Sequence, residues 1–176
     1  LKSGRVAVGT SRGLAFVSLR DGETMTTIGR KQGLPVDAIW ALAEGRDRHG
    51  VALWIGTSKG LYRWALRGGY GYQRYSVASG HLSDDWITAL VTHGDVLFAG
   101  TYNSGVVRLE ATAPKRAPAR TKPSYAAARL GGGWINFGGL RVVSSGAAKN
   151  TFLLAATMAG LKMSALNVPE PAVQLM

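Results

Sequence analysis

The sequence contains no cysteine among its 176 residues. This absence excludes disulfide scaffolds, thiolate zinc sites and cysteine nucleophiles. No apolar run approaches the ~18 residues that mark a transmembrane helix, so no span is predicted. Acidic side chains are also scarce: 10 aspartates and glutamates stand against 21 lysines and arginines, and the formal net charge is +11. We expect a basic surface that attracts anionic partners, or one that an acidic neighbour covers.

Two motifs of common catalytic classes are missing as well. The sequence has no Walker loop and no His-Glu-x-x-His zinc motif. The histidines, at positions 49, 81 and 93, fall in three different predicted turns, so they do not form a metal site. Asp84 and Asp85 are expected at a turn or strand entry, because adjacent strand residues point to opposite faces. The sequence therefore predicts no catalytic residue, metal or cofactor.

Glycine is abundant, at 24 of 176 residues, and it marks an internal repeat. Four segments share an apolar strand, a Gly-Thr step, a short polar turn that ends in glycine, and a second apolar strand. They cover residues 6–14, 53–61, 97–106 and 153–161, and the fourth copy has Ala156-Thr157 at the Gly-Thr step. Each copy predicts a β-hairpin whose turn glycine adopts a positive φ.

Further short strands are predicted between these hairpins. Residues 61–66 and 72–77 continue the second unit, and residues 37–43 and 85–91 begin consecutive units as their innermost strands. Four short strands in about 45 residues are typical of one propeller blade. We therefore predict an all-β fold, a single β-propeller region of four-stranded antiparallel blades. The blade repeats lie around residues 1–35, 36–80, 81–130 and 131–176.

The first and last units each lack a strand in this alignment. The first retains almost nothing of its innermost strand, and two prolines, Pro169 and Pro171, argue against an outer strand at the other end. We expect about four blades of a partial ring with incomplete end blades. Such an arc would be part of a longer polypeptide, or would be completed by another chain.

A basic, proline-rich insertion interrupts the repeat at residues 112–125. Residues 112–176 hold 8 basic and 1 acidic side chains, a net +7. The insertion is interpreted either as a tolerated surface loop or as an arm that binds an acidic partner. The candidate partner-binding residues are Lys115, Arg116, Arg120 and Lys122 in the insertion, and Arg63, Arg67 and Arg74 in the second unit.

Aromatic residues recur within the units. We predict matched positions for Trp40 and Trp86 in innermost strands, and for Trp54 and Phe98 in second strands. Matched aromatics in a repeat protein indicate packing between neighbouring blades. A stacking platform for bases or sugars is the alternative, because arginines stand close to several of the aromatic residues.

Several of these segments resemble the two-component-regulator propeller repeat. They are Gly33-Leu34-Pro35, residues 39–44 (Ile-Trp-Ala-Leu-Ala-Glu), residues 53–57 (Leu-Trp-Ile-Gly-Thr) and residues 60–63 (Gly-Leu-Tyr-Arg). The resemblance covers residues 1–111 well and the remainder poorly, and it departs at residues 46–52, where the family's short turn is lengthened. It implies a β-propeller, often the periplasmic or otherwise extracytoplasmic sensing part of a bacterial signalling protein.

The leading functional hypothesis is a noncatalytic β-propeller module, a sensor or a scaffold within a larger bacterial protein or assembly. It would recognise a protein partner, or the remainder of its own propeller, through loops on one face. One alternative is a propeller lyase or hydrolase with its site at the channel mouth. Another is a basic module that binds an anionic ligand, either nucleic acid or an acidic glycan.

Overall fold

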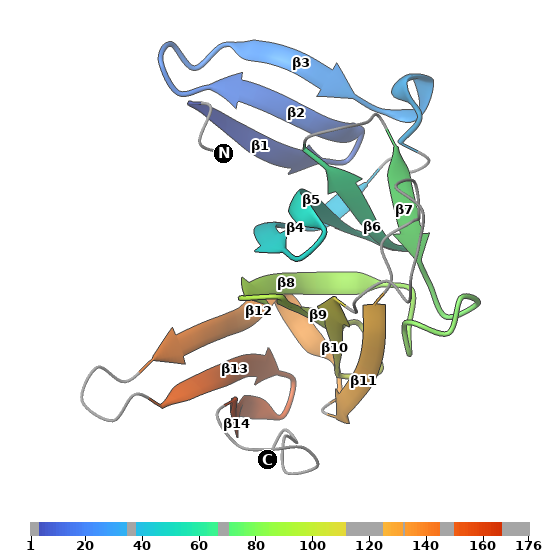
Figure 1. The fold of residues 1–176 in the computed structure, drawn as a ribbon, viewed down its shortest axis with the longest axis vertical. Coiled ribbons are helices and arrows are strands. Elements are labelled where there is room, and N and C mark those ends of the chain that lie inside the picture. The colour runs from blue at the N-terminus through green and yellow to red at the C-terminus, as the bar shows by residue number, and fades with distance from the viewer. Residues whose placement is uncertain are drawn as a thin grey trace.

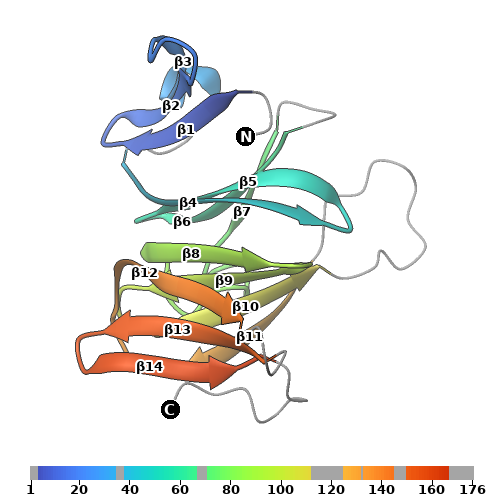
Figure 2. The same cartoon turned by 90° about the vertical axis from the view of Figure 1, so that its left-hand side faces the viewer.

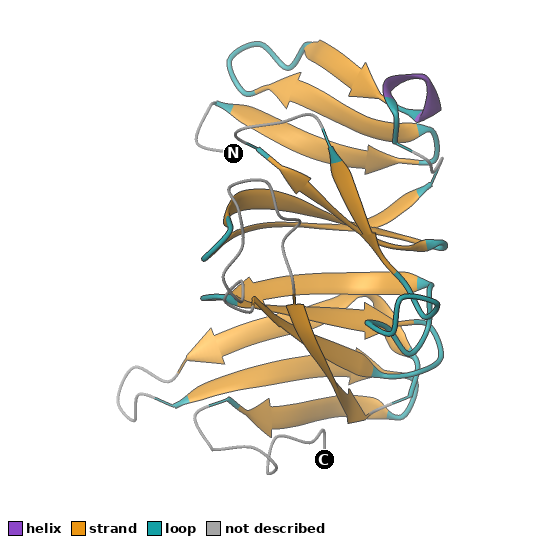
Figure 3. Cartoon of the chain, turned by 45° about the vertical axis from the view of Figure 1, so that its right-hand side comes forward, coloured by secondary structure: helices purple, strands orange, loops and turns teal. Residues whose placement is uncertain are grey.

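The computed structural model describes residues 4–34, 38–66, 71–111, 125–131, 133–144 and 150–166, and about two thirds of them are in strands (Figure 3). The strands are β1 (Arg5–Thr10), β2 (Gly13–Ser18), β3 (Thr24–Ile28), β4 (Ile39–Asp47), β5 (Gly50–Thr57), β6 (Gly60–Ala65), β7 (Tyr72–Tyr75), β8 (Ile87–His93), β9 (Val96–Thr101), β10 (Val106–Ala111), β11 (Tyr125–Gly131), β12 (Ile135–Ser144), β13 (Thr151–Thr157) and β14 (Gly160–Ala165). One 3-10 turn, η1 (Arg30–Gln32), lies between β3 and β4.

These strands form four antiparallel sheets in which each strand pairs with its neighbour in the chain. The sheets are β1–β3, β4–β7, β8–β11 and β12–β14, and we call them blades 1 to 4. The blades follow one another in chain order along the molecule (Figure 1, Figure 2). The predicted all-β class is confirmed, with two four-stranded blades between two three-stranded ones. The described residues form an arc of blades and show no closed ring.

The hydrophobic core consists of layers between successive blades. Leu14 and Phe16 of blade 1 pack with Leu53 and Ile55 of blade 2. Blade 2 packs on blade 3 through a second cluster that includes Trp54. A third cluster joins blades 3 and 4, and its buried members are Ala89, Phe98, Val106, Leu130, Ile135, Leu140, Leu153 and Ala155. Each sheet therefore gains most of its stability by burying a face against the next.

The repeated threonine fastens the same hairpin turn in every blade. Its hydroxyl donates to the carbonyl oxygen of the turn glycine at 2.7–2.8 Å and accepts a backbone N–H of the turn at 3.0–3.1 Å. The four pairs are Thr10 with Gly13, Thr57 with Gly60, Thr101 with Gly105, and Thr157 with Gly160. The turn glycines have φ between 76° and 124°, as the predicted hairpins require.

The repeated glycine before that threonine lies at the contact between neighbouring blades. A Cβ atom placed on Gly56 would lie 2.7 Å from Cγ2 of Ile87, the first residue of the next innermost strand. Gly9 meets Ile39, and Gly100 meets Ile135, at 2.6 Å in the same way. Ala156 takes this place in blade 4, where no described blade follows. Each of the three glycines therefore makes room for an isoleucine of the following blade.

A β-bulge follows this isoleucine in each innermost strand. In β4 the pairing passes from Ile39 with Thr57 to Ala41 with Gly56, so Trp40 is an extra residue. Thr88 is the extra residue in β8, and residues 136–139 form a longer irregularity in β12. A bulge re-aims the side chain that it carries. Near the start of each innermost strand, one side chain therefore departs from the regular alternation between the two faces of the sheet.

Two details of the sequence-based prediction are wrong. Because Ile39 corresponds to Ile87, Trp40 corresponds to Thr88 and not to Trp86. The lengthened turn expected at residues 46–52 is also absent: β4 runs to Asp47 and pairs there with Gly50, which leaves a two-residue turn. The additional residues extend the two strands instead. The turn between them is tight because the Asp47 carboxylate accepts the N–H of His49 at 2.7 Å and Gly50 adopts a φ of 103°.

Candidate aromatic binding surface

Five aromatic side chains meet at the end of the blades where the innermost strands begin, which we call the entry end. The group, which we call the aromatic surface, comprises Trp40 in β4, Trp86 before β8, Tyr102 after β9, Trp134 before β12, and Phe137 in β12. Its members come from blades 2, 3 and 4. They are separated by up to 97 positions in the sequence, and only the packing of the blades brings them together.

The rings form one continuous network. Trp86 and Tyr102 stack, with centroids 4.4 Å apart and planes 15° apart, and Tyr102 lies 4.3 Å from Trp134. Trp40 lies 5.4 Å from Phe137 and 6.2 Å from Trp86. Trp86 and Phe137 are 6.4 Å apart, which closes a triangle of three rings. These separations are those of interacting aromatic pairs, so the surface is a packed platform.

The two outer rings of this platform face solvent. Trp40 is 44% exposed and Phe137 is 50% exposed, whereas the other three side chains are half-buried. Both exposed rings stand on the bulges described above, which take them out of the inter-blade layers. Large exposed aromatic side chains that touch one another are uncommon on a surface without a binding role. The exposed part of the aromatic surface is therefore a candidate contact site.

Hydrogen bonds hold the inner part of the surface. One Asp84 carboxylate oxygen accepts the N–H of Trp86 at 3.0 Å, and the other accepts the N–H of Asn103 at 2.8 Å. The Tyr102 N–H donates to the carbonyl oxygen of Trp86 at 2.9 Å. Asp85 accepts the N–H of Val77 at 2.8 Å. The two aspartates thus hold a turn and a strand entry, the role that their sequence positions suggested.

Positive charge dominates the entry end of the described chain. Its exposed cations are Arg12, Arg30, Lys31, Lys59, Arg74 and Arg129, and its carboxylates are Asp84 and Asp85. The other described carboxylates lie toward the opposite end of the blades, at residues 21, 23, 44, 47, 95 and 110. Both entry-end carboxylates already accept hydrogen bonds from the protein. An anionic partner would therefore meet a favourable potential at the aromatic surface.

Two arginines border the aromatic surface at defined positions. Arg74 donates from Nε to the carbonyl oxygen of Lys59 at 2.8 Å, and its Nη2 lies 3.9 Å from the carboxylate of Asp85, the neighbour of Trp86. Arg129 donates from Nε to the carbonyl oxygen of Ser104 at 3.1 Å, in the turn that begins with Tyr102. In each arginine, Nε donates a hydrogen bond to a carbonyl oxygen in a hairpin turn. This bond holds the guanidinium in place while it stays exposed to solvent.

The candidate cations from the sequence lie in different settings. Arg74 is exposed at the entry end, whereas Arg63 is 4% exposed near the opposite end of blade 2. The Arg63 guanidinium lies 3.4 Å from the Asp47 carboxylate and 5.9 Å from the Trp54 ring centroid, so it acts as an interior ion pair. The remaining candidates, Arg67, Lys115, Arg116, Arg120 and Lys122, lie outside the described residues.

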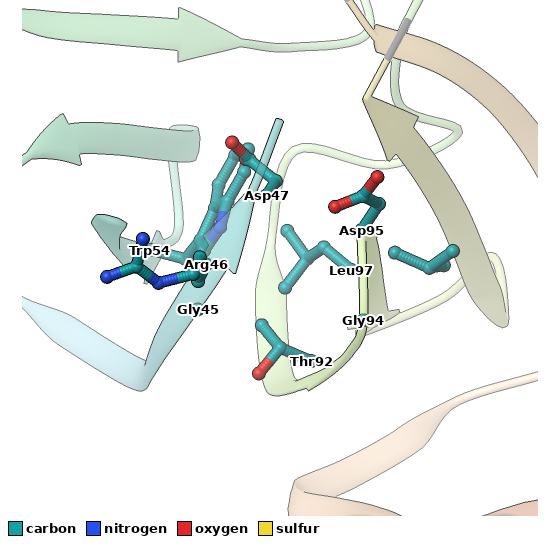
Figure 4. A pocket seen from close by; sticks show the side chains of 9 residues that line it. Gly45, Arg46, Asp47, Trp54, Thr92, Gly94, Asp95 and Leu97 are labelled. Carbon is teal, nitrogen blue, oxygen red and sulfur yellow. The ribbon is translucent and has the colours of Figure 1, made fainter. Parts of the chain in front are cut away.

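A small cavity lies between blades 2 and 3 near the end opposite the aromatic surface. It is lined by side chains that include Asp47, Trp54, Thr92 and Asp95 (Figure 4). Its volume of about 10 Å³ is at the lower limit for one water molecule. An exposed ion pair between Arg48 and Asp95, at 3.5 Å, joins the two blades nearby. The cavity is too small to hold a substrate.

The described residues contain no cluster of three or more His, Asp or Glu side chains that could hold a metal ion. His81 is turned toward the protein, with Nδ1 at 3.0 Å from the Ser79 hydroxyl and its ring 5.1 Å from that of Tyr75. No helix in the described part of the chain has the length and apolar character needed to cross a membrane.

Neither a protein-family model nor a curated protein matches this chain. The resemblance to two-component-regulator propeller repeats therefore remains an expectation.

Sequence reasoning identified Trp40 and Trp86 but did not place Tyr102, Trp134 or Phe137 with them. One signal was available, since Trp86 and Trp134 both precede the repeated isoleucine. Trp54 and Phe98 are each 2% exposed in inter-blade clusters, which confirms the packing role predicted for that pair. For Trp40 the exposed position favours the stacking alternative instead.

Proposed function

We propose that the chain is a noncatalytic binding module of the propeller type that recognises its partner at the entry end, through the aromatic surface. The observation that carries this proposal is the contact between Trp40 and Phe137, two large exposed rings contributed by different blades. The blades provide a rigid frame, and the loops and bulges at one end provide the contact groups. A sensor domain and an assembly scaffold both use a surface of this kind.

The outer faces of the end blades support a place for the module in a larger assembly. Val143, Leu161 and Met163 are 39%, 69% and 44% exposed, and strand alternation puts them on the face of blade 4 that points away from blade 3. Val6 and Val8 are similarly exposed on the outer face of blade 1. Such faces match the apolar character of the inter-blade layers, so further blades or another protein chain would cover them.

Site-specific photo-cross-linking tests where the partner binds. A photoreactive phenylalanine analogue is introduced at Phe137, and in a control at Leu19, which is 67% exposed in a turn at the opposite end. In extract of the source organism, the analogue at position 137 should give a discrete adduct that the Trp40→Ala substitution abolishes, and the control should not. The same adducts from both positions, or none from position 137, would contradict the proposal.

A further inference from the structure

We infer that the aromatic surface binds single-stranded nucleic acid, with bases stacked on its exposed rings and phosphates on the surrounding cations. This inference rests on the proposed function and specifies the chemistry of the partner. Proteins that bind single strands without strong sequence preference combine aromatic side chains for the bases with a positively charged path for the backbone. The entry end has both features in one place.

The exposed rings provide the stacking contacts. Trp40 and Phe137 are the solvent-facing members of the network, with centroids 5.4 Å apart and planes inclined by 42°. Trp86, which stacks on Tyr102, lies 6.2 Å from Trp40 and 6.4 Å from Phe137 and restrains the platform, so little side-chain freedom would be lost on binding. A flat, polarisable surface of this kind suits unpaired bases, because every base has a π-face to offer.

The cations provide the backbone contacts. Arg12 and Lys59 are exposed in the equivalent hairpin turns of blades 1 and 2, and Arg74 and Arg129 border the aromatic surface from blades 2 and 3. Both carboxylates of this end are engaged in bonds to backbone N–H groups. The entry end therefore repels a polyanion far less than the opposite end, where six of the eight described carboxylates lie.

A double-stranded polymer would not use this surface in the same way. Paired bases are stacked on each other, and their faces are not available to Trp40 or Phe137. An acidic glycan could satisfy the cations and pack a sugar ring on an aromatic side chain, but it does not offer the flat π-face of a base. The distinguishing property is thus a requirement for both the bases and the negative charge.

Fluorescence anisotropy with a labelled oligothymidylate of about 20 nucleotides measures this binding, and an abasic oligomer of equal length measures the contribution of charge alone. The whole chain should bind oligothymidylate at least about fivefold more tightly than the abasic oligomer. The Trp40→Ala/Phe137→Ala variant loses both stacking rings, so it should bind oligothymidylate more weakly by at least the 5- to 150-fold range that corresponds to about one stacked base, and the abasic oligomer almost as well as before. Trp40→Phe, which keeps a ring, should retain most of the affinity, and Leu19→Ala should be neutral.

The salt dependence tests the cations. Replacing Arg12 and Lys59 by glutamine should lower the slope of log affinity against log salt by about 0.7 for each phosphate that the protein no longer neutralises. The matched control replaces Arg20 and Arg46, two exposed arginines of the opposite end, and changes the net charge equally. Equal effects of the two double variants would mean general attraction to a basic protein and would overturn the inference.

Two further outcomes would overturn the nucleic-acid inference without refuting the proposed binding module. If the abasic oligomer and heparin both bind as tightly as oligothymidylate, the surface binds polyanions in general. A cross-linked adduct from position 137 that nuclease leaves unchanged, and whose tryptic digest contains peptides of a second protein, would identify a protein partner. The binding module would then stand and its nucleic-acid ligand would not. Failure of position 137 to cross-link at all refutes the proposed function itself.

Discussion

The contact between Gly56 and Ile87 allows a quantitative test of how the blades are held together. The Gly56→Ala substitution adds one methyl group whose carbon would lie 2.7 Å from Cγ2 and 3.1 Å from Cβ of Ile87, and 3.2 Å from Cβ of Ala41. Ile87 is fully buried, and its Cγ2 is fixed by the β-branch close to the backbone. The methyl group can therefore be accommodated only if the two blades move apart.

The expected magnitude follows from two opposing effects. Overpacking of a filled core costs about 1–3 kcal/mol. Replacing glycine with alanine also reduces the entropy of the unfolded chain, which returns about 0.4–1 kcal/mol where the native conformation permits a side chain. Taking the middle of each range, we expect Gly56→Ala to lower the free energy of unfolding by about 1.3 kcal/mol.

Urea unfolding followed by tryptophan fluorescence measures this difference, with a constant slope confirming that the transition itself has not changed. The matched control is Gly71→Ala, because no atom lies within 4 Å of a Cβ there and its φ is not in the left-handed region. It should be neutral or slightly stabilising. Ile87→Leu removes the branch that meets the new methyl group, so combining it with Gly56→Ala should cost at least ~0.5 kcal/mol less than the sum of the single changes. If Gly56→Ala is as stable as Gly71→Ala, the repeated glycine is not needed for blade packing.

Three other predictions concern the blades themselves. Thr57→Val should lower the free energy of unfolding by about 1–3 kcal/mol, as measured by urea unfolding, because it leaves buried turn groups without their hydroxyl partner, and the same change at half-buried Thr10 should cost less. Asp47→Ala should cost about 3–5 kcal/mol in the same assay because it leaves Arg63 buried without its carboxylate, and adding Arg63→Met should recover most of that loss. Burial raises the pKa of Tyr75, so the folded state holds this proton more tightly than the unfolded chain, whose tyrosines ionise near pH 10. The urea midpoint should therefore fall as pH rises above about 10, and less steeply in Tyr75→Phe; an equal fall in both would assign the alkaline loss to other groups.

The hairpins could be predicted from the sequence because their causes are local. The Gly-Thr step, the polar turn and the turn glycine lie within ten residues of each other, and the hydrogen bond from Thr57 to Gly60 spans three positions. The prediction of the innermost strands is less accurate: these strands begin at Ile39 and Ile87, two residues later than predicted. The loops before them are held by side chains such as Asp85, whose partner Val77 is eight residues away.

The candidate site was less predictable than the fold, because it depends on how different blades meet. Trp40 and Phe137 are 97 positions apart in the chain, and neither sits at a position that the repeat alignment singles out as exposed. Bulges decide where these side chains point, and a bulge depends on pairing between strands. The burial of Arg63 is a second case, since its charge suggested a surface role and its position beside Asp47 removes it from solvent.

The all-β class, the number of blade units and the chemistry of each turn could be predicted from residue type and spacing, because these features depend on residues close together in the chain. Which glycines tolerate no side chain depends on the packing of the blades, because Gly56 is constrained by Ile87 from another blade. Blade packing also separates the aromatic residues of the core from those of the surface. Trp54 and Trp40 have the same side chain, yet the first is 2% exposed in an inter-blade layer and the second is 44% exposed on a bulge. That difference comes from strand pairing and blade packing, which no local pattern encodes.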